Sequence, residues 1–272
     1  NDALLEYIFF APLSGLVLMP ILLEKKSYSH HLQHLLSVAL VICLTACNSS
    51  SGGSGSGSKC GDDKTEGNWP QTAFVTTWKT DNTGRSDDDQ VRINTSGEGY
   101  NYQVDWGDGS SDNEITGDIK HTYKSEGTYT ISIMGLFPRI EFGYDRRLYD
   151  SGEDYPDYKK LADQRKLMSI EQWGDTNLQS LTEAFYGAVH LVINASDSPD
   201  LSQVSDYSKM FYGTSCFNQD ISHWDVSSVV NMSKMFYGAS SFNQDLSSWD
   251  VSSVEYMNDM FEEARKFNQD IS

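Results

Sequence analysis

The 272-residue sequence lacks the short motifs that usually indicate catalysis. It has no P-loop, no glycine-rich dinucleotide fingerprint after a strand, no HExxH and no pair of CxxC motifs. Beyond the N-terminal signal described below it has only three histidines, at positions 121, 190 and 223, and none adjoins a nucleophile motif. We therefore expect no enzyme activity. The alternative is a carboxylate pair among the abundant aspartates, or a catalytic part beyond residue 272.

Positive charge is also scarce, because 20 lysines and arginines face 39 aspartates and glutamates, for a net charge of −19. Nucleic acid and anionic lipid would both be repelled, so we expect no nucleic-acid partner. We interpret the acidity as the solubility of an exported protein, with cation binding as the alternative. Glycine, serine, asparagine and aspartate are prominent, which favours turns and short strands over long helices.

A short apolar run lies at residues 35–44 and follows Lys25 and Lys26. Ten residues are too few to span a bilayer as a helix, but they suit the core of a signal peptide. We interpret residues 19–46 as that signal, and residues 1–18, which hold a second apolar stretch, as upstream sequence from a mis-set start. A hairpin of two membrane segments is the alternative.

The signal ends in Leu44-Thr45-Ala46-Cys47, which resembles the bacterial lipobox. That resemblance implies recognition of residues 44–46 by the signal peptidase, cleavage before Cys47 and lipidation of its sulfur. Asn48 then implies, in a Gram-negative host, a surface-exposed lipoprotein that its acyl chains anchor in the outer membrane. The Ser/Gly-rich residues 47–67 form a flexible tether. An ordinary signal peptide with an incidental cysteine is the alternative.

Cys60 and Cys216 are the only other cysteines of the mature chain. An oxidising compartment permits a disulfide between them. Cys216 aligns with Ser241 and Lys266 in the repeats described below, so no structural demand for a cysteine is visible there. The pairing stays open at this point.

Residues 68–136 alternate short apolar runs with Gly- and Asp-rich turns, which predicts a β-sandwich. We expect strands at residues 73–78, 91–94, 100–106 and 129–134, and in the last of these one buried face with Tyr129, Ile131 and Ile133. The text DWGDGS at 105–110, HTY at 121–123 and GTYTI at 127–131 resembles the PKD (polycystic kidney disease) domain. The resemblance implies an immunoglobulin-like fold without catalysis.

Two aspartates in this unit, Asp105 and Asp108, could be taken for metal ligands. We interpret them instead as acceptors for backbone amides in the tight glycine turn. His121 has no partner at metal-ligand spacing, and we expect a structural role. Residues 137–169 are predicted to be an acidic connector, in which a calcium site is an alternative to a solvated loop. Its acidic candidates are Asp150, Glu153, Asp154 and Asp157.

Residues 170–272 repeat with a period of 25 residues. MFYG at 210–213 recurs at 235–238, and FNQDIS at 217–222 recurs at 242–247 and 267–272. One copy cannot bury its apolar residues alone, whereas stacked copies can. We predict a leucine-rich-repeat-type solenoid, with short strands at 217–221 and its equivalents, short helical turns, and a single column of Phe217, Phe242 and Phe267.

Stacking would also align polar residues into columns, with asparagine at 218, 243 and 268 and glutamine at 219, 244 and 269. Their side-chain amides could hydrogen-bond along the array. Asp220, Asp245 and Asp270 would form a like-charge column, in which neighbours repel by roughly 1 kcal/mol in water. These aspartates are therefore expected to accept backbone amides, to face open water or, as weak metal candidates, to share cations such as calcium.

The repeat text FNQDIS-x-WDVSSV-x-x-M-x-x-MF resembles the Mycoplasma-type lipoprotein repeat of BspA-like leucine-rich-repeat surface proteins. The resemblance implies a surface protein that adheres to protein or glycan ligands of a host or neighbouring cell, and it defines no individual binding residues. A structural spacer in a surface assembly is the alternative. Because residue 272 falls in mid-repeat without a polar cap, we expect the array to be truncated.

Overall fold

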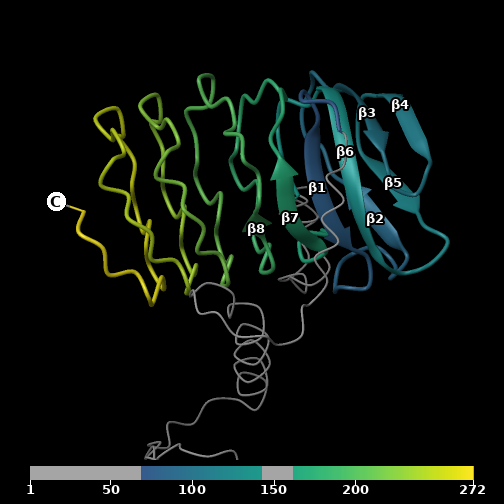
Figure 1. The fold of residues 1–272 in the computed structure, drawn as a ribbon. Coiled ribbons are helices and arrows are strands. Elements are labelled where there is room, and N and C mark those ends of the chain that lie inside the picture. The colour runs from purple at the N-terminus through teal and green to yellow at the C-terminus, as the bar shows by residue number, and fades with distance from the viewer. Residues whose placement is uncertain (1–68, 143–161, 272) are drawn as a thin grey trace, which may run out of the picture. The chain divides into compact units, whose positions relative to one another are not determined.

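The computed structural model describes residues 69–142 and 162–271, which all belong to one compact unit (Figure 1). Over these ranges the protein is mainly β, as expected, and contains no helix. These ranges therefore offer no helix that is long and apolar enough to cross a membrane. The expectation of short helical turns in the repeats is wrong. The turns there are closed by hydrogen bonds to the third residue back, and the alternate amides bond to the next copy, so no helical ladder continues.

The first part of the chain contributes six strands. They are β1 (Phe74–Lys79), β2 (Gln90–Ile93), β3 (Asn101–Asp105), β4 (Ser111–Ile115), β5 (Ile119–Thr122) and β6 (Thr128–Leu136). β2 and β5 form a two-stranded sheet, while β4, β3, β6 and β1 pair antiparallel in that order. Residues of both sheets, such as Phe74, Val91 and Ile131, share one buried core.

The four strands expected from the sequence correspond to β1, β2, β3 and β6. Ile131 and Ile133 are buried as predicted, whereas Tyr129 is only half-buried and stacks on Tyr123. The sequence did not predict β4 and β5, because their residues are mostly polar and at least partly exposed. Such edge strands carry no alternating apolar signal.

The large sheet continues past the first part into the repeats. β7 (Leu167–Gln172) pairs antiparallel with β1, and β8 (Val192–Ile193) pairs parallel with β7. The sheet order is therefore β4-β3-β6-β1-β7-β8, and Figure 1 shows the repeat copies continuing this row. β7 begins inside the range predicted as a connector, so one sheet runs across both predicted domains.

Within the repeats the backbone amides bond alternately within a copy and to the next copy. In residues 232–239, the amides of Met232, Lys234, Phe236 and Gly238 donate to carbonyl oxygens of the following copy at N···O distances of 2.8–2.9 Å. The amides of residues 235, 237 and 239 donate three residues back, at 3.0–3.2 Å. The Ser233 amide donates to the side-chain oxygen of Asn231, two residues back in the same copy, at 3.0 Å. All eight amides are thus satisfied although the segment is neither helix nor regular strand.

Aromatic columns fill the interior of the stack. Phe217, Phe242 and Phe267 lie in one column, with centroid separations of 5.9 and 6.0 Å, which confirms the predicted register. A second column, which contacts the first, consists of Phe185, Phe211, Phe236 and Phe261, 5.6–5.7 Å apart. The short strand predicted at residues 217–221 is wrong, because the Asn243 amide donates to a side-chain oxygen of the preceding copy instead of a backbone carbonyl.

Candidate functional site

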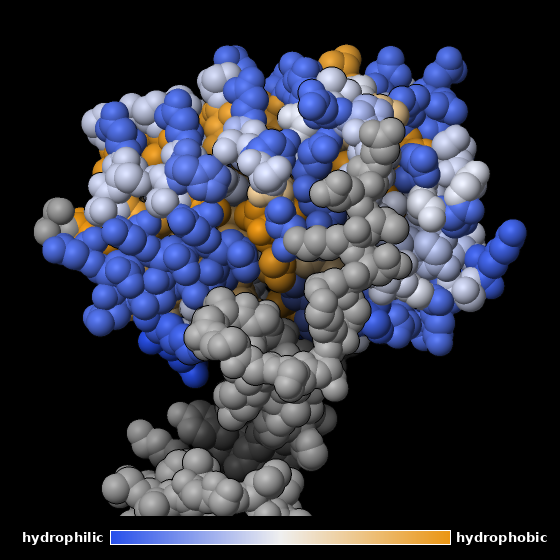
Figure 2. All heavy atoms as spheres, viewed as in Figure 1, coloured by the Kyte–Doolittle hydropathy of each residue, from blue (hydrophilic) through white to orange (hydrophobic). Residues whose placement is uncertain are grey.

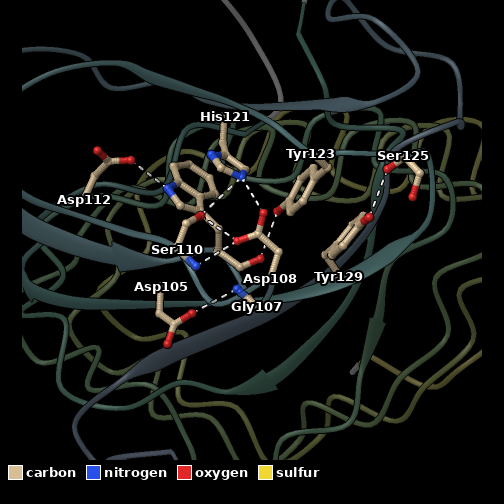
Figure 3. A network of polar contacts seen from close by, with 10 residues as sticks. Asp105, Gly107, Asp108, Ser110, Asp112, His121, Tyr123, Ser125 and Tyr129 are labelled. Atoms are coloured by element: carbon tan, nitrogen blue, oxygen red, sulfur yellow. Dashed lines mark hydrogen bonds and ion pairs between the residues drawn. The ribbon is translucent and has the colours of Figure 1, made fainter.

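The glycine turn between β3 and β4 is held by its aspartates, as Figure 3 shows. Asp105 Oδ1 accepts the Gly107 amide and Asp108 Oδ1 accepts the Ser110 amide, each at 2.9 Å. The predicted role of these two aspartates as backbone acceptors is confirmed. Since each closes a turn two residues long, their oxygens are committed to the local backbone.

The same turn brings Asp108, Ser110 and His121 together (Figure 3). His121 Nε2 lies 3.0 Å from Asp108 Oδ2 and 3.5 Å from Ser110 Oγ, and Ser110 Oγ donates to Asp108 Oδ1 at 2.5 Å. A serine–histidine–acid relay places the acid and the serine on opposite ring nitrogens. Here both face Nε2 and bond to each other, so the arrangement does not match a relay. The imidazole stacks on Trp106 at 4.7 Å, and the cluster fixes the turn against β5.

Two glycines of this turn offer a matched test of its geometry. Gly107 and Gly109 both have left-handed φ, +75° and +88°, but a Cβ on Gly107 would lie 2.3 Å from the Thr130 carbonyl oxygen, whereas one on Gly109 meets nothing within 4 Å. We expect Gly109→Ala to lower the free energy of unfolding by about 1 kcal/mol from backbone strain. Gly107→Ala should cost at least about 2 kcal/mol more. Urea unfolding of both variants measures the difference. Equal losses would show that the close approach of the Thr130 carbonyl in β6 does not require a glycine at position 107.

The predicted aspartate column of the repeats lies on the surface. Asp220 Oδ1 accepts the Ser222 amide and Asp245 Oδ1 accepts the Ser247 amide, both at 2.9 Å, and Asp270 is the equivalent residue of the next copy. Hydrogen bonds from Ser222 and Ser247 lower the pKa of the Asp220 and Asp245 carboxyls. The negative charges of Asp220 and Asp270 raise the pKa of Asp245, but by less. Across residues 69–142 and 162–271, no group of three or more His, Cys, Asp or Glu residues is placed to hold a metal ion.

The aspartate–serine turns predict acid sensitivity. The pKa of each turn aspartate is lowered by hydrogen bonds from the serine two residues later; the set is Asp200, Asp220, Asp225, Asp245 and Asp250. A carboxyl whose folded pKa lies below its unfolded value stabilises the fold above about pH 4, and this contribution is lost as the pH falls through the folded pKa. We expect a constant melting temperature between about pH 5 and 7 and a decline below about pH 4.

The control for this prediction replaces all five turn aspartates by asparagine, whose carbonyl oxygen still accepts the serine amide but does not titrate. The decline of the melting temperature in acid should become shallower in this variant. An unchanged acid profile would mean that other carboxyls govern acid unfolding.

The asparagine and glutamine columns bond along the stack, but to backbone groups. Asn218 Oδ1 accepts the Asn243 amide and Asn243 Oδ1 accepts the Asn268 amide, both at 2.8 Å. Gln244 Nε2 donates to the Asn218 carbonyl at 2.9 Å. The face of the repeat part seen in Figure 2 is largely covered by hydrophilic residues, with apolar ones visible between them.

A tyrosine column is the surface feature that sequence reasoning missed. Tyr186, Tyr212 and Tyr237 are half-buried and stack face to face, with centroids 4.5 and 4.6 Å apart and planes within 6°. The signal was present in the recurring Phe-Tyr-Gly text, in which the phenylalanine is buried and the next residue must point elsewhere. Because the faces of Tyr212 are covered by its neighbours, its ring edge is what a ligand can contact.

Two ion pairs, each between one lysine and one acidic residue, accompany the tyrosine column. Lys209 Nζ lies 2.7 Å from Glu183 Oε1, and Lys234 Nζ lies 3.6 Å from Asp259 Oδ2. Lys234 Nζ also lies 5.7 Å from the ring centroid of Tyr237, within the range of a cation–π contact. These residues, together with Tyr186, Tyr212 and Tyr237, are called the tyrosine face below. It combines aromatic rings with charges of both signs, and Glu262 and Glu263 lie close enough to raise the pKa of Tyr237.

Several predicted site residues fall outside the described residues. These are Leu44, Thr45, Ala46 and Cys47 of the lipobox, the calcium candidates Asp150, Glu153, Asp154 and Asp157, and Cys60. Cys216 is disulfide-bonded, so the repeat part does carry a disulfide. Whether its partner is Cys60, which the sequence left open, concerns a residue outside the described ranges.

Comparison with known proteins locates a family in one part of the chain. No curated protein and no solved structure matches the sequence significantly. A family model does match, and its range begins two residues before β7 and takes in all of the stacked copies. Residues 165–272 are thus similar to the family described as "Mycoplasma protein of unknown function, DUF285".

Proposed function

We propose that this protein is a non-catalytic binding protein of a bacterial surface, which recognises a protein or glycan ligand through the tyrosine face. In this proposal residues 170–272 form a BspA-like solenoid of the leucine-rich-repeat type. Residues 68–136 form a PKD-like, immunoglobulin-like sandwich that presents it. Cys47 carries the lipid that anchors the chain in the outer membrane.

The observation that carries the proposal is the continuous stack of copies with its half-buried tyrosines, whose ring edges reach the surface. Tyrosine offers a large, rigid contact area with a polar tip and loses little conformational entropy on binding, and it is enriched at interfaces. Stacking holds the rings of Tyr186, Tyr212 and Tyr237 in place before a ligand arrives. Such pre-organisation lowers the entropy cost of binding. The match to a Mycoplasma family is compatible with a bacterial surface protein.

The binding proposal is tested with the full chain on a glycan array and on a panel of purified extracellular-matrix proteins. We expect saturable binding to at least one probe and a loss of at least about tenfold in affinity for the double variant Tyr212→Ser/Tyr237→Ser. The matched control is Ser227→Ala/Ser252→Ala, which alters the exposed aspartate–serine turns of the same copies. Absence of saturable binding would favour a structural spacer, and equal losses in both variants would move the ligand away from the tyrosine face.

The anchor is tested separately. Cells that express the chain are grown with labelled palmitate, and we expect the label in the protein and its loss in Cys47→Ser. Cys60→Ser, which alters a cysteine outside the lipobox, should keep the label. Label retained in Cys47→Ser would contradict the lipobox interpretation without affecting the binding proposal.

A further inference from the structure

The ammonium group of Lys166 is buried inside a ring of oxygen atoms. Its side chain has no solvent exposure, and Nζ lies 2.7 Å from the Asp87 carbonyl oxygen and 3.0 Å from the carbonyl oxygens of Ser86 and Gln90. Ser86 Oγ lies at 3.0 Å as well. An ammonium has three hydrogens for these four oxygens, so its hydrogen-bonding capacity is fully used.

The ring belongs to the acidic loop of residues 84–90 between β1 and β2. This loop contains Asp87, Asp88 and Asp89, whose carboxylates, with that of Asp163, raise the pKa of Lys166 against the larger lowering effect of burial. The loop passes so close to the lysine that a Cβ on Gly84 would lie 2.6 Å from Lys166 Cε. Only glycine fits at that position without displacing the lysine stem.

Asp163 accepts hydrogen bonds from the same loop. Its Oδ1 accepts the amides of Arg85 and Ser86 at 2.8 and 2.9 Å, and its Oδ2 accepts Ser86 Oγ and the Arg92 amide at 2.5 and 2.8 Å. The carboxylate is 1% exposed. Asp163 and Lys166 lie just before β7, so the segment that leads into the repeats supplies an anion and a cation that hold a loop of the six-strand first part.

Backbone carbonyls that converge on one point are the ligands that replace the hydration shell of a monovalent cation. We propose that loop 84–90 is a cation cage whose occupant is the tethered ammonium of Lys166, and that shortening this lysine turns the cage into a site for a free monovalent cation. The cage joins the segment before β7 to the first part of the chain, which contains β1 to β6. The conformation of loop 84–90 therefore depends on residues 163–166.

The test compares full-length wild type, Lys166→Ala and Lys166→Met by thermal melting in equal concentrations of methylammonium, potassium or tetramethylammonium chloride. We expect both variants to melt about 6–20 °C below wild type in tetramethylammonium, which is too large for the cage. Methylammonium or potassium should raise the melting temperature of Lys166→Ala saturably, by ligand linkage. Lys166→Met should not respond, because its terminal methyl group takes the place of lysine Cε and leaves no room for a free cation beside the oxygen atoms.

Lys234→Ala is the control for removal of a lysine at the surface, since Lys234 is about two-fifths exposed in its ion pair. It should melt close to wild type and respond equally to all three salts. The proposal is overturned if Lys166→Met is as stable as wild type, or if Lys166→Ala behaves identically in methylammonium, potassium and tetramethylammonium, including failure to fold in all of them.

Discussion

Replacing Phe236 by alanine is expected to lower the free energy of unfolding by about 3–5 kcal/mol. The ring is fully buried in the interior column, 5.6 Å from Phe211 on one side and 5.7 Å from Phe261 on the other. It also stacks on Phe242 at 4.1 Å. Its removal opens a cavity that neighbouring copies cannot fill, because backbone hydrogen bonds on both sides hold them in register. Urea unfolding followed by far-UV circular dichroism measures the loss.

Phe261→Ala is the matched control, since Phe261 occupies the same position one copy later and is only half-buried. Its removal leaves less of a cavity, and we expect a loss less than half as large. If both variants lost the same free energy, the burial of the ring would not set the size of the loss.

Asp163→Ala is the second large effect, and we expect a loss of about 3–5 kcal/mol. The substitution leaves the amides of Arg85, Ser86 and Arg92 without their acceptor. It also removes the charge that most strongly favours the protonated form of the buried Lys166. Unsatisfied buried donors lose the hydration that they had in the unfolded chain, which is why removing one partner costs more than one hydrogen bond.

The control for Asp163 is Asp81→Ala. Asp81 pairs with Lys79 at 2.6 Å on the surface, where solvent screens the ion pair, so we expect a much smaller loss than for Asp163→Ala. Hydrogen exchange adds a local readout, because Asp163→Ala should increase exchange at the amides of residues 85, 86 and 92 before the rest of β2 opens. A loss below 1 kcal/mol for Asp163→Ala would mean that this loop holds its conformation without the carboxylate.

The repeats were the most predictable part of the molecule. An interval of 25 residues between identical side chains implies one register for stacking, and the column of Phe217, Phe242 and Phe267 follows from that register alone. The aspartate roles were predictable for the same local reason, because an aspartate two residues before an amide forms a turn of known geometry. The tyrosine face was overlooked although it repeats in the same way, since a half-buried aromatic position gives no clear burial signal.

By itself, the sequence determined a mainly β chain, the stacking register and the turn chemistry, because each depends on residues that are close in sequence or related by a constant interval. Only the tertiary structure decided that β7 pairs with β1, across roughly ninety residues of chain, and that Asp163 and Lys166 enclose loop 84–90. Those contacts join segments without a shared period. β7 is selected by its backbone pairing with β1 and by the burial of Leu167 and Ile170 in the core, whereas the hydrogen bonds of loop 84–90 offset the cost of burying Asp163 and Lys166. The spacing of residues along the chain encodes neither.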